Sequence, residues 1–265
     1  AAGIVAETLA ETPATEICET DMMIKPPYAE TQRCRGNLNV HRFIDPFLSV
    51  SLRLCVTISI CCFCLAVRPA SSEEIAVSRF ATEGIKGWES KSFKGDTTYS
   101  IVQDDGKTVL KAHAKSAASG LSKKLKFNPH THRYLKWSWK IAGTVALGNE
   151  KTKQGDDYAA RVYVVFPGRF FWQMRALNYI WANKLPVGDY VPNAFTSNAM
   201  LLAVESGNEK AGQWVSEERD ILTDYRRVFG EDPPEAGAVA IMTDTDNTGA
   251  EATAWYGEIT LSTKP

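Results

Sequence analysis

The segment Gly155–Phe166 places two adjacent carboxylates, a guanidinium and a phenol close together in the chain. Asp156 and Asp157 could accept hydrogen bonds from sugar hydroxyls, coordinate a cation or pair with Arg161. Because successive side chains of a strand point to opposite faces, Asp157, Arg161 and Tyr163 are expected on the same side. We therefore predict that these four residues contact a ligand. A purely structural pairing of the carboxylates with Arg161 is the alternative.

Trp181 is the aromatic residue that we predict to complete this site, as a flat platform for a sugar ring. A concave site needs apolar surface and a few polar groups, which Trp181 and Arg161 would supply together. The alternative is that Trp181 packs in the core. The leading hypothesis is therefore a non-catalytic domain that binds a carbohydrate or another component of the cell envelope.

An enzyme on the same scaffold is the second hypothesis. In a polysaccharide lyase, Arg161 would neutralise a uronate carboxylate, and Tyr163 or His113 would take or return a proton. A tyrosine has an unperturbed pKa of about 10, so a nearby cation would have to lower the pKa of Tyr163 before it could act as a base. A glycosidase that acts through Asp or Glu stays open. The sequence assigns no catalytic residue.

A turn rich in oxygen ligands occupies residues 244–249. Asp244, Asp246 and Asn247 could offer oxygens to Ca²⁺, which takes about 6–8 oxygen ligands. An EF-hand would need Glu at the last loop position, where this chain has Trp255, so an EF-hand is excluded. A structural Ca²⁺ and a turn stabilised by its own Asx side chains are the two interpretations. No other cofactor is expected, because neither a phosphate loop nor a dinucleotide fingerprint occurs.

The 265-residue chain carries a formal net charge of -1 and is 44% hydrophobic, values that are ordinary for a folded soluble protein. After residue 72 it has 24 basic and 24 acidic residues and no basic stripe, so nucleic acid is not an expected partner. All six cysteines precede residue 65. The part of the chain that follows therefore offers no disulfide, thiolate metal site or cysteine nucleophile.

An apolar run at 47–67, led by arginines and followed by small residues at Ala70 and Ser72, has the pattern of a secretory signal peptide. We assign 41–72 to this signal, with cleavage near Ser72, and predict a bacterial periplasmic or extracellular location. The alternative is an uncleaved anchor, since the run approaches the ~20 residues that span a bilayer. Only in that case would a membrane be a partner. Residues 1–40 form an upstream segment to which we assign no fold.

Short runs separated by Gly, Asn and Asp fill the chain from residue 73 onward, a pattern typical of an all-β sandwich or barrel. The clearest alternation lies at 134–142, where two Trp residues share a face with Leu135 and Ile141 and polar residues occupy the other face. This alternation indicates a strand that is buried on one side. We predict a single domain at 73–265, an antiparallel β-sandwich of jelly-roll (galactose-binding-like) type.

One short helix is predicted at 224–229. Two arginines in its last turn and Gly230 just after it are typical of a helix C-terminus. A longer helix over 217–229, capped by Ser216, is the alternative.

Several of these motifs occur in the order that is found in one bacterial family. They are Gly155–Phe166, Tyr179–Ala182, Glu218–Asp220, Asp224–Arg226, Phe229–Gly230 and Ile241–Thr248. In this respect the chain resembles the domain-of-unknown-function family DUF3047 over about residues 76–262. The resemblance implies an exported bacterial protein, and it implies no activity, so no catalytic residue carries over. The layout is also similar to jelly-roll carbohydrate-binding modules, an analogy of fold that does not fix function.

Overall fold

The computed structural model describes residues 73–265, except for the side chain of Phe171. The predicted signal at 41–72 and the upstream segment at 1–40 lie outside the described residues. Within the described part of the chain, no helix combines the length and apolar character needed to cross a bilayer.

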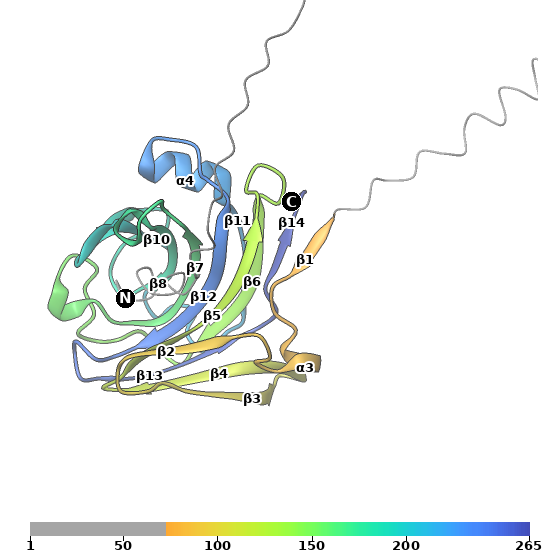
Figure 1. Ribbon diagram of the computed structural model, residues 1–265. Coiled ribbons are helices and arrows are strands. Elements are labelled where there is room, and N and C mark those ends of the chain that lie inside the picture. The colour runs from red at the N-terminus through yellow and green to blue at the C-terminus, as the bar shows by residue number, and fades with distance from the viewer. Residues whose placement is uncertain (1–72) are drawn as a thin grey trace, which may run out of the picture. The chain divides into compact units, whose positions relative to one another are not determined.

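Two seven-stranded sheets make up the described residues (Figure 1). The first sheet contains β1 (Glu74–Ala76), β3 (Thr98–Asp104), β4 (Lys107–Lys115), β6 (Tyr134–Ile141), β11 (Val215–Asp220), β13 (Glu251–Tyr256) and β14 (Thr260–Ser262). The second sheet contains β2 (Glu89–Lys94), β5 (Ala118–Phe127), β7 (Tyr158–Phe166), β8 (Arg175–Ala182), β9 (Tyr190–Asn193), β10 (Thr196–Ser206) and β12 (Ala236–Asp244). In the first sheet the order is β1-β14-β6-β13-β4-β3, with β11 on the other edge of β6, and in the second it is β2-β5-β12-β7-β8-β10-β9.

The chain crosses repeatedly from one sheet to the other, as a jelly roll does. Strands β4, β5, β6 and β7 alternate between the sheets, and so do β11, β12 and β13. The predicted β-sandwich of jelly-roll type is therefore confirmed. One ladder departs from the antiparallel expectation, because β10 runs parallel to β8. The long connection at 183–195, which includes β9, returns the chain to the end of the sheet where β8 began, as a parallel pair requires.

The core between the sheets is built around the alternation seen in the sequence. Trp137 and Trp139 of β6 point across to Tyr179 and Trp181 of β8. The rings of Trp137 and Tyr179 have centroids 5.4 Å apart, and those of Trp139 and Trp181 are 5.8 Å apart. Large aromatic side chains remove much apolar area from water, so this cluster fixes how the two sheets face each other.

The predicted helix at 224–229 begins earlier than expected. Strand β11 runs to Asp220, and α4 (Ile221–Phe229) follows at once. The Asp220 carboxylate accepts the Thr223 N–H and so caps the helix, while Gly230 ends it with φ 74°. The same aspartate ends a strand and starts a helix, which alternation alone does not reveal. A second short helix, α3 (Phe80–Glu83), was not predicted.

At the edge of the first sheet, Glu217 of β11 is half-buried and accepts a hydrogen bond from Trp139 Nε1 at 3.2 Å. Burial raises the pKa of this carboxyl to about 7, and the Glu205 carboxylate adds to the rise, whereas the bond from Trp139 opposes it. The folded protein therefore keeps a proton that the unfolded chain releases above its usual pKa of 4.5. The resulting stabilisation is complete below this value and is lost as the pH rises toward 7.

We expect Glu217→Gln to abolish this pH dependence, because glutamine keeps an acceptor for Trp139 and cannot ionise. Relative to the variant, the natural chain should lose about 1–2 kcal/mol of stability between about pH 5 and about pH 8. This energy is lower than the full pKa shift implies, because Glu217 is partly exposed to solvent. Urea unfolding at the two pH values measures the difference. Glu218→Gln, which removes an exposed neighbouring carboxylate, is the matched control. Parallel pH profiles for the natural chain and Glu217→Gln would refute the prediction.

Candidate ligand site on the inner face of the second sheet

The second sheet curls on itself, so that one face packs against the first sheet and the other lines the inside of the curl (Figure 1). We call the latter the inner face. It carries two apolar clusters, both made only of residues from the second sheet and its connecting loops. The first comprises Ala118, Tyr163, Val165, Met174, Ala176, Ala199, Ala238, Ala240 and Met242, and the second Tyr158, Ile180, Ala182, Leu185, Leu201 and Ala203. Five of the nine residues in the first cluster are alanines, so small side chains make up much of the inner face.

A bulge in β7 decides which side chains reach this face. Arg161 pairs with Met242 of β12, whereas Asp244, two residues further along β12, pairs with Tyr158. Strand β7 therefore has one residue more than its partner over this stretch, and such a bulge breaks simple alternation. Ala159 and Ala160 both pack in the main core, which lets Tyr158 join Arg161 and Tyr163 on the inner face.

Arg161 is fully buried and all of its hydrogen-bonding groups have protein partners. Its Nε donates to Asp244 Oδ1 at 2.9 Å and its Nη2 to Asp244 Oδ2, while Nη2 also donates to the Asp156 carbonyl at 2.8 Å. The guanidinium lies 4.0 Å from the centre of the Tyr158 ring. Burial alone would lower the pKa of Arg161, but the Asp244 carboxylate, together with Tyr163, Asp156 and Tyr158, more than offsets this effect and holds the pKa well above its usual value. Arg161 is thus a paired cation.

Tyr163 is also sealed on the inner face. Its hydroxyl lies 3.3 Å from Arg161 Nη1 and 3.8 Å from the Met242 sulfur. Burial raises the pKa of Tyr163 above its usual value despite Arg161, so this phenol is a poor base. The other base considered for a lyase, His113, lies on β4 of the first sheet beside Thr253. The geometry therefore argues against the proton-transfer roles that the lyase hypothesis requires.

The two adjacent aspartates hold the start of β7 in place. Asn193 Nδ2 donates to both carboxylate oxygens of Asp156, at 2.9 and 3.0 Å. The Asp157 carboxylate accepts the backbone N–H groups of Asn247 at 3.1 Å and Thr248 at 2.6 Å. Both carboxylates are buried. Asp156 thus ties β7 to β9, and Asp157 ties it to the turn after β12.

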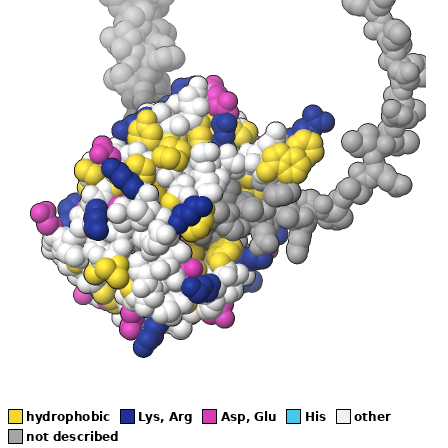
Figure 2. Space-filling model, turned by 90° about the vertical axis from the view of Figure 1, so that its left-hand side faces the viewer, with side chains coloured by type: hydrophobic (Ala, Val, Ile, Leu, Met, Phe, Trp, Pro, Cys, Tyr) yellow, Lys and Arg dark blue, Asp and Glu magenta, His cyan; other side chains and the backbone are white. Residues whose placement is uncertain are grey.

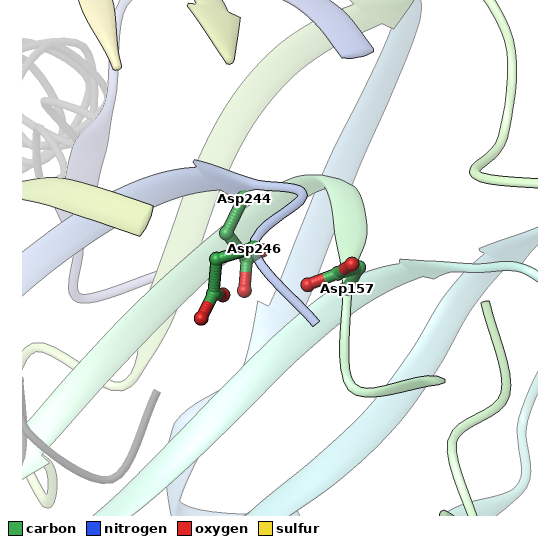
Figure 3. A group of neighbouring side chains, drawn as sticks. All are labelled: Asp157, Asp244 and Asp246. Carbon is green, nitrogen blue, oxygen red and sulfur yellow. The ribbon is translucent and has the colours of Figure 1, made fainter. Parts of the chain in front are cut away.

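That turn also brings three carboxylates together. One oxygen each from Asp157, Asp244 and Asp246 lies within 4.8 Å of the others, and Figure 3 shows the Asp157 side chain extending toward the other two. Asn247, the third predicted calcium ligand, instead donates its backbone N–H to Asp157. Asp244 and Asp157 already have several hydrogen-bond partners. Oxygen ligands of this kind suit Ca²⁺, and the structural Ca²⁺ stays a prediction.

Trp181 lies on the opposite face of the second sheet from Arg161 and Tyr163, so these three side chains do not line one concave site. Its ring is buried in the core against Trp139, and its Nε1 donates to the Gly207 carbonyl at 3.0 Å. The reason is the alternation along β8, where Leu177, Tyr179 and Trp181 face the first sheet. The core interpretation of Trp181 accounts for all of these contacts.

Asn178 is the inner-face residue that we did not predict. It lies between Ala176 and Ile180, which both point inward, and it pairs with Tyr163 across the ladder. Its side chain is 1% exposed, and neither Nδ2 nor Oδ1 has a hydrogen-bond partner. Each buried unpaired group costs about 1–3 kcal/mol. A lone Asn inside an apolar strand, where Asn is disfavoured, is the signal that was available in the sequence.

The family model described as "Protein of unknown function (DUF3047)" matches residues 86–260, which covers most of the described sandwich. The chain belongs to the DUF3047 family. No curated protein matches this DUF3047 chain.

Several solved structures are similar to the DUF3047 sandwich at low identity. The endoglucanase cel12A from Rhodothermus marinus has 10% identity and a TM-score of 0.38, with 72% of this chain and 99% of that one covered. The mannan-recognising carbohydrate-binding module TmCBM27 has 8% identity and a TM-score of 0.32, with 73% and 96% covered. The Endo-D glycoside hydrolase domain from Streptococcus pneumoniae R6 has 12% identity and a TM-score of 0.34, with 67% of this chain and only 22% of that one covered. Likeness of this degree says nothing about what the DUF3047 chain binds.

The inner face of this DUF3047 protein therefore has a definite chemical character. The Arg161 guanidinium and the carboxylates of Asp156, Asp157 and Asp244 all have hydrogen-bond partners, which are one another, backbone groups or the Asn193 amide. The apolar wall of the inner face is interrupted by the unpaired amide of Asn178. On the face shown in Figure 2, basic and acidic side chains are interspersed with hydrophobic ones, without a large patch of one sign.

Proposed function

We propose that this protein is an exported, non-catalytic binding protein that holds a carbohydrate of the cell envelope against the inner face of its second sheet. Export rests on the signal-peptide pattern at 41–72, and it places the protein in the bacterial periplasm or outside the cell. The ligand contacts come from Asn178 and Tyr163, while Asp156, Asp157, Arg161 and Asp244 shape the wall behind them.

The unpaired amide of Asn178 is the observation that carries this proposal. A side-chain amide offers two donor hydrogens and an acceptor oxygen, and neighbouring hydroxyls of a sugar can satisfy both ends together. Ala176, two residues before Asn178 on β8, is one of the alanines of the inner face, so on that side the wall beside the amide is low. Since Asn178 and its neighbours are buried, binding must rearrange what covers them, and we expect slow association.

Replacing Asn178 with Leu should separate binding from stability. Leucine has a similar volume and no polar atoms, so the variant should be as stable as the natural chain or more stable by about 1 kcal/mol. Affinity for the carbohydrate should fall about tenfold or more, because the hydrogen bonds to the amide are lost. Retardation in gels that contain neutral or acidic polysaccharides measures binding, and urea unfolding measures stability.

Gln103→Leu is the matched control, since it removes an exposed amide from β3 of the first sheet. It should leave both gel retardation and the unfolding midpoint unchanged. A destabilised Asn178→Leu variant with undiminished retardation would mean that the amide has a structural partner and no ligand. Absence of retardation of the natural chain across the polysaccharide panel would remove the carbohydrate from the proposal.

A further inference from the structure

A cavity lies outside the inner face, where the loop between β7 and β8 meets the segment that follows α4. Its volume is about 530 Å³, and its lining includes Pro167, Trp172, Arg175, Asn198 and Glu231. It is of the size that small-molecule sites have, roughly 300–1,000 Å³. Asp156, Asp157, Arg161, Tyr163 and Trp181 all lie outside its lining.

An exposed pair of aromatic rings borders this cavity. Phe170 and Trp172 stack with centroids 4.7 Å apart and an interplanar angle of 6°. The two side chains are 46% and 58% exposed, although both are large and apolar. Scattered apolar side chains are common on surfaces, whereas a contiguous aromatic surface next to a cavity is informative about binding.

The backbone around the rings is fixed by hydrogen bonds. Gln173 N–H donates to the Phe170 carbonyl at 2.9 Å, and Phe170 N–H donates to Gln173 Oε1 at 3.3 Å. Asn198 Nδ2 donates to the Trp172 carbonyl at 2.7 Å. A Cβ on Gly168 would come within 2.5 Å of Gln173, so only glycine fits beneath the turn. The ring pair is therefore held ready, which lowers the entropy lost on binding.

The charges around the cavity already neutralise one another. Arg175 Nη1 lies 2.5 Å from Glu231 Oε1 and donates to the Tyr225 hydroxyl at 3.2 Å. Asp232 lies 2.5 Å from Arg226. The carboxylates of Glu231 and Asp232, already paired with arginines, would repel an anionic ligand, and Arg175 would repel a cationic one. The cavity therefore favours neither charge. Paired ions can still exchange hydrogen bonds with hydroxyl groups, which are strong when one partner is charged.

We propose that this cavity is a second carbohydrate site, in which a neutral sugar ring stacks on Trp172 and its hydroxyls bind Arg175 and Glu231. The flat apolar face of a pyranose matches the indole, and the equatorial hydroxyls match the paired ions at the cavity wall. The inference rests on the proposed function only for the class of ligand. The two sites share no residue.

Affinity electrophoresis through gels that contain glucan, mannan or xylan tests this site with neutral glycans. We expect Trp172→Ala to weaken retardation about tenfold, because the ring supplies most of the contact surface, and Phe170→Ala to weaken it less. Gly168→Ala should also weaken it, since it displaces the turn without removing a ring. Trp255→Ala is the control, as this Trp lies on the first sheet against Lys111 and Lys140.

Equal retardation of Trp172→Ala and the natural chain would overturn the second site. If Asn178→Leu abolishes retardation in that case, the inner face stands as the carbohydrate site and the cavity does not. If Trp172→Ala abolishes retardation and Asn178→Leu does not, the cavity is the site and the inner-face proposal fails. Equal losses in Trp172→Ala and Trp255→Ala, or capture of a proline-rich peptide instead of every glycan, would overturn the assignment of the cavity to a sugar.

Discussion

Replacing Arg161 with Met should lower the free energy of unfolding by about 3–5 kcal/mol. The variant leaves the Asp244 carboxylate buried without its cation, in a part of the fold where Asp157 and Asp246 already lie close by. The cost of taking this charge out of water is offset mainly by the two-pronged contact with the guanidinium, to which the Tyr158 N–H adds one hydrogen bond. Native domains are stable by about 5–15 kcal/mol, so the loss should be visible as a large shift of the urea midpoint.

A double variant tests whether the unpaired charge is the cause. Asp244→Asn keeps an oxygen that can accept the Tyr158 N–H and removes the negative charge. We expect Arg161→Met with Asp244→Asn to recover at least half of the stability that Arg161→Met loses, because no buried charge is left alone. Arg133→Met, which breaks a partly exposed pair with Asp220, is the control and should cost less. A loss below about 1 kcal/mol in Arg161→Met would show that the pair is not sealed from water.

Trp181→Ala should cost about 3–5 kcal/mol of stability, because it empties the centre of the core. The side chain is fully buried, it packs on Trp139, and its indole N–H is used by the Gly207 carbonyl. Any loss of ligand binding in this variant should therefore follow the fraction of unfolded protein. Thermal and urea unfolding, followed at several temperatures alongside gel retardation, measure both quantities.

Trp172→Ala is the matched control for the unfolding measurement alone, since it removes the same residue type from a largely exposed position. It should change the free energy of unfolding by no more than about 0.5 kcal/mol, as most surface substitutions do. Trp181→Phe should fall between the two, because a smaller aromatic ring leaves a smaller cavity. If the Trp181→Ala variant is stable and folded but binds no glycan, Trp181 contacts the ligand and the core interpretation is wrong.

The layers of the fold could be predicted because their causes are local. Alternation in 134–142 and the glycine-rich turns indicate half-buried strands, and a chain of this kind buries its apolar faces only by stacking two sheets. The parallel pairing of β8 with β10 could not be predicted in the same way. It depends on where a long connection returns, and that is decided by packing far away in the sequence.

The candidate site was only partly predictable for a similar reason. Residue types pointed to Arg161, Tyr163 and the two aspartates. Arg161 does contact Tyr163 and the Asp156 carbonyl, whereas the Asp157 carboxylate binds the turn after β12. The bulge at Ala159 and Ala160 is set by pairing with β12, so simple alternation could not place Tyr158 among them. Trp181 is predicted to bind the ligand but lies in the core between the sheets. The sequence pattern of a tryptophan is the same in a core and in a binding site, and only the pairing of its strand decides between them.

The two margins of the second sheet bear on how such chains behave when crowded together. Strand β9 is only four residues long and contains Pro192, which has no backbone N–H to donate to an additional strand. Strand β2, at the other margin, has the sequence ESKSFK and is mostly exposed, with three charged residues among its six. Short, proline-bearing and charged margins resist recruitment of a further strand. At high protein concentration, molecules of this chain should therefore not pair through their sheet edges into fibrous aggregates.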